Sequence, residues 1–533
     1  MIPKMYLRRD ARRSALRVSS VIVATAVAVT LAGCGSSGKT SSSSGPKSGG
    51  SVTVLEGAGF AGNWPGLDPA TDTDGAANQS YMDSIFGELF ELHAGGAIVG
   101  DLATGYSFTN GGKTVNITLR QGVKFSDGTP FNAAAVVFNW TRDLAATCTC
   151  KPVFLSPPVI KATGPYSVSL TLTYVDAPFI NGLQGNVFNW IASPTAVNKM
   201  GEKAFALKPV GAGPFTVVSD TPDSELVLKK NPLYWQKGLP YLDNLTFKSV
   251  AGDEQALTAM EAGSGQAYEG ISTPQLVPAF KSKFTVTAEP GTSPYDIQLN
   301  TKIAPFNNIM AREAIYYATN AALLDKSLFN DTYPVGESFE APAGLFYEPT
   351  VPGYLTYDLN KAKALVQQLG GLTFNLGTIN VPTAISMDEA IQTEWQAAGM
   401  HVTLQDWDLT GLIGAFTQGQ WQSMLQTAGA YDPGTGVGIC FRFCSTSPFT
   451  GVHDAKLDQM LEGAAGTANT ATRQKLYDQA AAYIAQNAYG PFLFSIAGYN
   501  VAAHGVNAPG LTTSIPSTDV NPEVLWQYAY NTG

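Results

Sequence analysis

The first 33 residues constrain the fold and location of this chain most, because their pattern is typical of a leader that is removed before the rest folds. Six basic residues precede an uncharged, mostly apolar stretch from Val18 to Ala32. That stretch is shorter than the roughly 20 residues that a membrane-spanning helix needs. A basic segment followed by a short apolar segment is typical of a secretory signal. We therefore expect residues 1–33 to be a signal peptide, whether exported by the general or the twin-arginine route.

The signal ends in Leu31-Ala32-Gly33-Cys34, which resembles the lipobox of bacterial lipoproteins. The resemblance implies that the Cys34 thiol carries a lipid and that cleavage occurs just before it. Such a lipid would anchor the chain to the extracytoplasmic face of the cell membrane, stably if two or more acyl chains insert. An ordinary cleaved signal or a short membrane anchor is the alternative. Residues 34–50, which are rich in Gly and Ser, predict a flexible tether.

Charge and length exclude several classes of function. The formal net charge of the whole chain is −10, and loss of the basic leader makes it more negative. This balance argues against nucleic acid or anionic lipid as the main partner. No later stretch is long and apolar enough for a spanning helix, so we expect a soluble body with two or three lobes.

Four cysteines remain after the leader, namely Cys148, Cys150, Cys440 and Cys444. Outside the cytoplasm, disulfides are a better interpretation of them than a thiolate metal site. Cys440 and Cys444 are spaced for a local bridge, whereas a bond between Cys148 and Cys150 would be strained. Bridges between the two pairs are the other option, so the sequence leaves the connectivity open.

Hydrophobic patterns predict an α/β body. Val115, Ile117 and Leu119 alternate with polar residues, as in a half-buried strand, and Asn132 is placed to cap a following helix. Asp358 predicts the start of a helix over 359–369, and a capping box at 386–389 predicts another that ends at Gly399. A further helix is expected over 471–487. Helices followed by strand-like runs such as 402–404 predict βαβ units in the second half.

Two phosphate-binding fingerprints match the sequence but fail in context. Residues 33–40 fit the P-loop pattern, yet a signal precedes them and a Ser/Gly tether follows, where a strand and a helix are required. Residues 57–62 fit the dinucleotide pattern, yet Pro65 and Pro69 follow where a helix should start. We therefore expect no nucleotide cofactor.

Catalytic and metal-binding motifs are missing from the sequence. There is no His-Glu-x-x-His or Gly-x-Ser-x-Gly motif, and the four histidines are scattered without ligand spacing. No His/Cys/Asp cluster suits nickel. We expect no metal site and no enzyme, although a carboxylate pair for glycoside hydrolysis is not excluded by sequence.

Residues 119–131, Leu-Arg-Gln-Gly-Val-Lys-Phe-Ser-Asp-Gly-Thr-Pro-Phe, closely resemble the signature of the peptide/nickel/oligopeptide-binding family (family 5) of ABC-transporter solute receptors. Weaker similarities follow the same order as in that family. They are Gly66 to Pro69, Gly211 to Phe215, Asn231 to Trp235 with Leu239 to Asp243, Asn300 with Pro305 to Asn307, Arg312 to Ile315, Asp358 to Ala362, and Ala398 to Met400.

The resemblance implies an α/β, bilobal periplasmic-binding-protein-like fold of type II, in the large peptide-binding class, with two hinge crossings. Lobe I would comprise 51–292 with 497–533 returning to it, and lobe II would comprise 293–496. The implied function is capture of a small solute, peptide-like or otherwise, and its delivery to the permease subunits of an ABC importer by a monomer. A secreted surface hydrolase, or a ligand sensor or adhesin of the same fold, is the alternative.

The family resemblance also selects residues for the cleft. Peptide-binding members use an aspartate for the ligand amine, and here that position falls on Gly429 or Ala430, so free-amine peptides are doubtful. Tyr431 and Asp432 are the nearest polar substitutes, unless Asp-Pro only marks a turn. The aromatic residues proposed as ligand walls, each with burial in the core as its alternative, are Phe60, Trp64, Trp190, Tyr295, Trp407 and Trp421. The ligand itself is not identified by the sequence.

Overall fold

The computed structural model of the chain describes residues 45–57, 66–72, 78–146, 154, 156–379, 382–427, 431–435, 438–516 and 523–533. The predictions for the signal peptide, and those for Cys34, Phe60, Trp64, Cys148 and Cys150, lie outside these residues. Residues 46–533 form one compact unit, and only that unit is described below.

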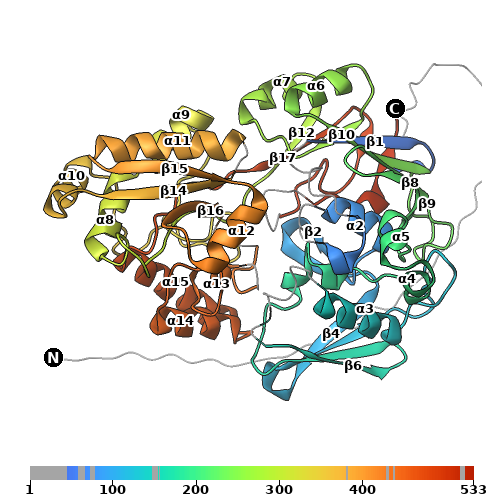
Figure 1. Cartoon of the computed structure of the whole chain (residues 1–533). Helices are drawn as coiled ribbons and strands as arrows, with labels where there is room; N and C mark the ends of the chain where they lie inside the picture. The colour runs from blue at the N-terminus through green and yellow to red at the C-terminus, as the bar shows by residue number, and fades with distance from the viewer. Residues whose placement is uncertain are drawn as a thin grey trace, which may run out of the picture. The chain divides into compact units, whose positions relative to one another are not determined.

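Strands from both ends of this unit build its largest sheet (Figure 1). The sheet has seven strands in the order β12-β17-β11-β1-β10-β9-β8. Central β1 is parallel to β10 and β11, and its buried Val52 and Val54 face a large hydrophobic core. The strands are β1 (Ser51–Gly57), β8 (Phe215–Thr221), β9 (Glu225–Lys230), β10 (Asn244–Val250), β11 (Ala267–Glu269), β12 (Thr285–Glu289) and β17 (Gly498–Ala502).

A second, antiparallel sheet of four strands belongs to the same lobe, in the order β4-β5-β7-β6. Its β5 contains the predicted alternating strand, which is confirmed: Val115, Ile117 and Leu119 are each 1% exposed. The predicted cap of the next helix is also confirmed, because the Asn132 side chain accepts from the Ala135 N–H at 3.1 Å. The strands of this sheet are β4 (Ala103–Thr109), β5 (Thr114–Leu119), β6 (Val159–Gly164) and β7 (Ser167–Thr171). Two small strand pairs are β2 (Phe90–His93) with β3 (Ala97–Gly100), and β18 (Val506–Asn507) with β19 (Tyr530–Asn531).

A four-stranded sheet with the order β13-β16-β14-β15 forms the centre of the other lobe. Its strands are β13 (Tyr295–Leu299), β14 (Thr373–Ile379), β15 (His401–Trp407) and β16 (Ser423–Thr427). Parallel β14 and β15 are joined by α11 (Pro382–Ala397), which confirms a βαβ unit in the second half. We call the part with the seven-stranded sheet lobe I and the part with this sheet lobe II.

Helix boundaries agree with the sequence in two cases and differ in one. Asp358 caps α10 (Leu359–Gln368) through the N–H groups of residues 360 and 361, and α15 (Thr470–Gln486) lies one residue from its prediction. The predicted start at the 386–389 capping box is wrong, because α11 already begins at Pro382. Proline is favoured in the first turn of a helix, where its missing N–H has no partner to lose.

The remaining helices cover the sheets and connect their strands. In lobe I they are α2 (Gln79–Phe86), α3 (Ala133–Ala145), α4 (Pro194–Met200), α5 (Glu202–Leu207), α6 (Asp253–Glu261) and α7 (Val277–Lys281). In lobe II they are α8 (Ile309–Ala318), α9 (Ala321–Phe329), α12 (Leu409–Gln418), α13 (Ile439–Phe443) and α14 (Ala455–Ala465). Short 3-10 helices are η1 (Pro69–Thr71), η2 (Ala94–Gly96), η3 (Asn110–Gly112), η5 (Asn181–Leu183), η6 (Val187–Asn189), η7 (Pro274–Leu276) and η8 (Trp526–Tyr528).

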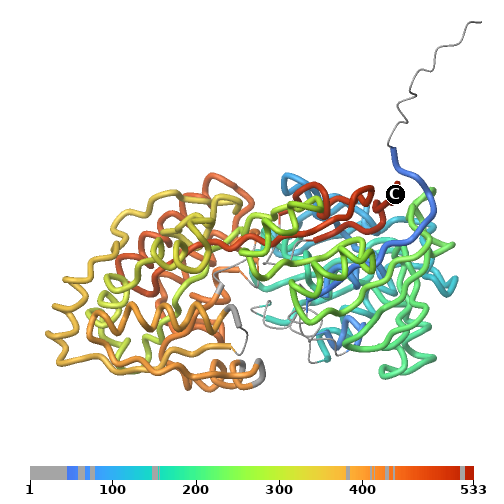
Figure 2. The backbone as a smooth tube through the Cα atoms, turned by 90° about the horizontal axis from the view of Figure 1, so that it is seen from above, coloured from blue at the N-terminus to red at the C-terminus, as the bar shows by residue number. Residues whose placement is uncertain are grey.

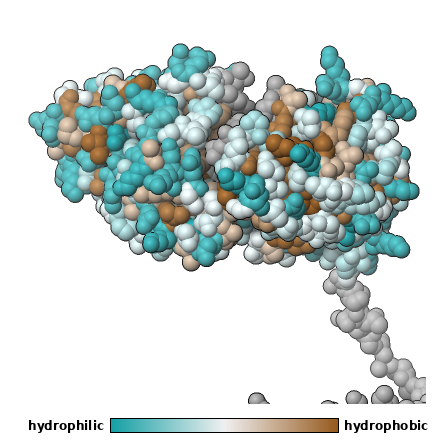
Figure 3. Space-filling view, turned by 90° about the horizontal axis from the view of Figure 1, so that it is seen from below, coloured by the Kyte–Doolittle hydropathy of each residue, from teal (hydrophilic) through white to brown (hydrophobic). Residues whose placement is uncertain are grey.

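The chain passes between the lobes twice, as Figure 2 shows from above. It leaves the lobe I sheet after β12 and enters the lobe II sheet at β13, and it returns through residues 492–497 to β17. Two crossings at one place suit a hinge. Hydrophilic side chains cover much of the face seen from below, and hydrophobic ones gather in a group on lobe I (Figure 3). Among the described residues, no helix is both long and apolar enough to span a bilayer.

Candidate ligand site between the two lobes

The carboxyl ends of three lobe II strands share one edge of their sheet. Strands β14, β15 and β16 run in the same direction and end at Ile379, Trp407 and Thr427. Antiparallel β13 starts at the same edge with Tyr295, which pairs with Thr427. Ligands of open α/β sheets bind beyond such carboxyl edges. The fold thus brings the predicted residues Tyr295 and Trp407 to the edge where a ligand is expected.

Lobe I presents a carboxyl edge of the same kind. Strands β1, β11 and β12 end together, because β17 runs antiparallel to both β11 and β12. Glu56, Glu269 and Glu289 lie at the carboxyl ends of these three strands. The chain then runs directly from Glu289 to Tyr295. The carboxyl edges of the two sheets therefore adjoin at this crossing.

The lobe I edge is acidic, and its glutamates accept hydrogen bonds from neutral groups. Glu269 accepts from Ser80 Oγ at 2.7 Å and from the Trp526 indole at 2.9 Å. Glu289 accepts from Ser514 Oγ at 2.5 Å. Burial raises the pKa of Glu269 to about 7 and that of Glu289 to about 8.

Glu56 on the same edge accepts a hydrogen bond from the Tyr81 hydroxyl. Burial raises the pKa of Glu56 well above its usual value, and repulsion from Glu269 raises it further. A positive charge or a hydrogen-bond donor beside these buried carboxyls would therefore be attracted.

Tyr431 of lobe II inserts into lobe I. It is 8% exposed and packs in a small cluster with Leu92, Ile515 and Leu525. A Cβ atom on Gly96, which has a φ of +78°, would lie only 1.6 Å from Tyr431 Oη. This position thus needs glycine for its backbone conformation and for the close approach of the tyrosine. Tyr431 is an apolar contact between the lobes.

Asp432 adds a polar contact at the same place. Its carboxylate is fully buried and forms a bidentate ion pair with Arg473 of α15, whose Nη1 lies 3.0 Å from Asp432 Oδ2. Across the lobes, Asn181 Nδ2 donates to the same oxygen at 2.8 Å. Nearby, the Ala177 N–H donates to the Ala465 carbonyl at 2.9 Å. The structure therefore holds the two lobes in contact.

A cavity of about 750 Å³ lies beside these contacts, a size that suits a small ligand. Lobe I supplies Asp176, and burial raises the pKa of that carboxyl to about 7, with Asp432 raising it and Arg473 lowering it. Aromatic, small and polar residues of both lobes line the rest. The walls include Phe154, Tyr174 and Val175 from lobe I, and Gly434, Thr435, Cys440, Phe441, Pro448, Gln459 and Glu462 from lobe II.

The other two predicted tryptophans lie inside the lobes. Trp190 is 0% exposed in the lobe I core, and its indole donates to Asp83 Oδ1 at 2.6 Å. Trp421 is 3% exposed, packs on Phe416, and precedes β16 at the end opposite its carboxyl edge. Burial in a core, the alternative that the sequence left open, accounts for both side chains without a ligand.

One of the disulfide alternatives is realised among the described cysteines. Cys440 and Cys444 are joined in a local bridge over α13. Cys440 also lines the cavity, so the bridge supports part of its wall.

Sequence reasoning missed Asn181, Asp176 and Arg473, which meet Asp432 or the cavity. Arg473 lies on α15, where it could equally have been an ordinary surface charge of an amphipathic helix. Asp176 lies in an irregular segment and Asn181 begins the three-residue η5, so neither follows a periodic pattern. No local signal identifies any of the three, because their partners are distant in sequence.

Comparison with known proteins places the chain among binding proteins. Residues 97–445 match the family model described as "Bacterial extracellular solute-binding proteins, family 5 Middle". The glutathione-binding protein GsiB of Salmonella typhi is 32% identical over 311 residues, which are 58% of this chain and 60% of the relative. GsiB of Escherichia coli O157:H7 matches with the same identity and coverage. The matched region thus spans about three fifths of these relatives.

Solved structures share the fold over nearly the whole chain. The binding protein DppA of Helicobacter pylori, in complex with the peptide STSA, has a TM-score of 0.76 at 22% identity and covers 91% of this chain and 99% of its own. AgaA of A. tumefaciens R10, in complex with agropinic acid, has a TM-score of 0.75 at 20% identity, covering 89% and 99%. At these identities the likeness establishes the bilobal fold alone.

Proposed function

Because this chain belongs to family 5 of the bacterial extracellular solute-binding proteins, we propose that it captures a small solute between its lobes and delivers it to the permease of an ABC importer. The observation that carries the proposal is the cavity of about 750 Å³ with walls from both lobes. A ligand that touches both lobes favours the closed arrangement over the open one, and its differential affinity drives closure.

Tyr431 and Asp432 are proposed to act as the closing contacts. Tyr431 buries an aromatic ring against lobe I, and Asp432 meets Asn181 of that lobe. Both contacts join residues far apart in the chain and would be lost if the lobes separated. Tyr295 and Trp407 lie at the lobe II edge and do not line that cavity, so they are proposed to contact a ligand that extends to the edge. The same is proposed for Phe60 and Trp64, which follow β1 in sequence.

The ligand is proposed to be a short peptide or a related amino-acid derivative. The relatives named above bind glutathione, and the structural neighbours were solved with a peptide and with agropinic acid. Asp176 in the cavity and the glutamates of the lobe I edge would attract positively charged or hydrogen-donating groups of such a ligand. No catalytic step is needed for capture and release, so we propose a receptor and not a hydrolase.

Direct binding measurements test the proposal. Glutathione and a panel of di- to tetrapeptides would be titrated into the purified protein by calorimetry, and solution scattering would follow the radius of gyration. We expect a member of the panel to bind and to favour the compact form. Tyr431→Ala should weaken binding about tenfold or more, since a buried aromatic contact across the lobes contributes about 2 kcal/mol. Tyr357→Ala, which removes a 43% exposed tyrosine of lobe II, is the matched control.

Binding without any change in scattering would contradict closure of the lobes over a ligand. Turnover of a bound peptide by the purified protein would instead favour the hydrolase. Equal affinities of the Tyr431→Ala and Tyr357→Ala variants would remove Tyr431 from the closing contacts.

The anchor and the lobe limits are part of the same proposal. Cys34 is proposed to carry the lipid, residues 34–50 to form the tether, and the lobes to comprise 51–292 with 497–533, and 293–496. Cys34→Ala should move the protein from the membrane fraction to the soluble extracytoplasmic fraction. A variant that stays with the membrane would contradict lipid anchoring at Cys34.

A further inference from the structure

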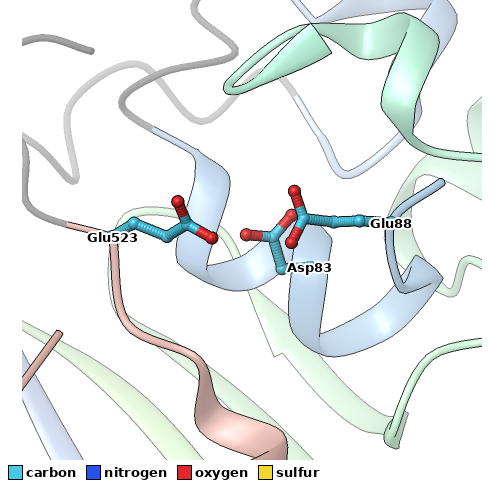
Figure 4. A group of neighbouring side chains, drawn as sticks. All are labelled: Asp83, Glu88 and Glu523. Atoms are coloured by element: carbon cyan, nitrogen blue, oxygen red, sulfur yellow. The ribbon is translucent and has the colours of Figure 1, made fainter. Parts of the chain in front are cut away.

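Three carboxylates from separate parts of lobe I converge in its interior. Asp83 lies on α2, Glu88 follows α2, and Glu523 precedes η8 near the C-terminus. One oxygen of each lies within 4.8 Å of those of the other two. Figure 4 shows the carboxylates directed toward one another. Their residues are only 5%, 2% and 4% exposed.

Each of these groups keeps an oxygen without a hydrogen-bond donor. Asp83 accepts from the Trp190 indole through Oδ1, and Glu88 accepts from Asn189 Nδ2 through Oε1 at 2.7 Å. Asp83 Oδ2, Glu88 Oε2 and Glu523 Oε1 accept no hydrogen bond from the described residues. Buried acceptor atoms normally accept a hydrogen bond or bind an ion, so the unpartnered oxygen of each carboxylate indicates that a partner is missing.

No basic side chain balances the cluster among the described residues whose charges act on it. Those charges come from other acids: Glu91 acts on all three carboxyls, and Glu269 acts on Asp83. The segments 58–65, 73–77 and 517–522, which the structure does not describe, contain no Lys, Arg or His in their sequence. Among the described residues, no basic side chain therefore offsets the charge of the cluster.

A neutral side chain also points into the cluster. Gln79 lies one turn before Asp83 on α2 and is 6% exposed. Its amide lies close enough to lower the pKa of both Asp83 and Glu523, yet its Nε2 makes no hydrogen bond of ordinary geometry. Rotation of the amide by half a turn would present Oε1, a good cation ligand, to the same space.

We propose that Asp83, Glu88 and Glu523, together with Gln79, bind a hard divalent cation, for which Ca²⁺ is the best match. All the available ligands are oxygens, which hard cations prefer. Two oxygens on one Ca²⁺ lie up to about 5 Å apart, since each Ca–O distance is about 2.3–2.6 Å. The observed limit of 4.8 Å satisfies this. Mg²⁺ usually keeps several waters and suits a buried protein cage less well.

The cation would join the C-terminal segment to α2. Glu523 lies three residues before Trp526, whose indole contacts Glu269 at the lobe I carboxyl edge. Binding would therefore stabilise lobe I beside the crevice. This inference is independent of the transport function, since it requires neither a solute nor a permease.

Terbium luminescence tests the site directly in the purified chain after treatment with EDTA. Tb³⁺ replaces Ca²⁺, and the Trp190 indole, hydrogen-bonded to Asp83, is well placed to sensitise its emission. We expect saturable emission that Ca²⁺ displaces and that Mg²⁺ displaces at least tenfold less effectively. In parallel, Ca²⁺ at a hundredfold excess over Kd should raise Tm by about 2–5 °C.

Two isosteric variants and a matched control complete the test. Asp83→Asn and Glu523→Gln should each lose the Tb³⁺ emission and the response of Tm to Ca²⁺. Asp388→Asn, which neutralises a carboxyl that is 1% exposed in lobe II, should keep both. Absence of saturable emission from the unmodified protein would overturn the proposal, and so would an equal rise of Tm with NaCl at matched ionic strength. The unmodified protein could also show no response to Ca²⁺ while both cluster variants have a higher Tm. That result would show that the carboxyls are held protonated instead of binding a cation.

Discussion

Buried carboxylates near the crossing between the lobes are held in two different ways. At the lobe I carboxyl edge, Glu269 and Glu289 are held by neutral hydroxyl and indole donors, and their pKa values are raised. In lobe II, Asp432 is also buried but is paired with Arg473. The lobe II carboxyl edge itself carries Tyr295 and Trp407.

This difference separates two tasks of a binding protein. A buried carboxylate with its own arginine is neutralised internally, so it contributes to structure and little to attracting a ligand. A buried carboxylate without a base favours a proton, a cation or a donor group of a ligand. Under the proposed function, the lobe I edge would select by charge and the lobe II edge would supply aromatic surface, with Tyr431 and Asp432 as the closing contacts.

The largest effect is expected from Arg473→Met. This change leaves the buried carboxylate of Asp432 without its partner, and the free energy of unfolding should fall by about 3–5 kcal/mol. Urea denaturation at pH 7.5 measures it. Lys283→Met is the control, because the Lys283–Glu261 pair is exposed and should contribute about 1 kcal/mol or less. Equal losses in the two variants would show that the buried Asp432–Arg473 pair contributes no more than an exposed one.

Trp421→Ala and Trp407→Ala should separate the two ends of the lobe II sheet. Trp421 is buried, so its removal should cost about 3–5 kcal/mol of stability, with the ligand affinity of the folded protein unchanged. Trp407 is half-buried at the carboxyl edge, and its ring packs against Gly377. Its removal should therefore lower the free energy of unfolding less than removal of Trp421, and should weaken ligand binding more. Denaturation and calorimetry together check this. The reverse pattern would place the ligand at the other end of the sheet.

Glu289→Gln tests the unpaired charge of lobe I through pH. The pKa of Glu289 is about 8 in the folded chain and about 4.3 in the unfolded chain. A raised folded pKa stabilises the protein at low pH, and that contribution is lost as pH rises toward 8. Between pH 5 and pH 9, unmodified protein should lose about 2–4 kcal/mol more than the variant. Parallel curves of unfolding free energy against pH would contradict burial of an unpaired carboxyl here.

The smallest effect concerns closure and Asp176. Burial raises the pKa of Asp176 to about 7 in the closed arrangement, where Asp432 repels it and Arg473 attracts it. Closure should therefore take up a proton, and ligand affinity should fall by about tenfold between pH 7 and pH 8 or slightly above. Asp176→Asn should flatten this dependence. Calorimetry in buffers of different ionisation enthalpy would measure the number of protons taken up on ligand binding. If the unmodified protein takes up no proton, the prediction is wrong.

Local patterns predicted local structure well. The alternation around Val115 and the caps at Asn132 and Asp358 were confirmed, since each depends on residues close in sequence. The capping box at 386–389 was misinterpreted, because α11 extends four residues further to Pro382. Family motifs, which combine many such local preferences, were enough to predict the bilobal α/β fold that the solved structures share.

The candidate site was predicted only in part. Tyr295 and Trp407 were brought to a carboxyl edge, and Tyr431 and Asp432 to the contact between lobes. Their partners Asn181 and Arg473 could not be identified, because nothing near either residue in sequence marks it. Trp190 and Trp421 illustrate the converse, since a tryptophan in a core and one in a ligand wall look alike in sequence.

By itself, the sequence determined several strands and helices and the order of the family motifs, because these depend on periodicity and on contacts within a few residues. Only the tertiary structure decided which charges are neutralised, that Cys440 pairs with Cys444, and that Asp83, Glu88 and Glu523 meet. The meeting of residues as distant as Glu88 and Glu523 depends on burial and on the packing of separate segments, and local spacing does not encode either. Spacing allowed the Cys440–Cys444 bridge but left the other pairings open.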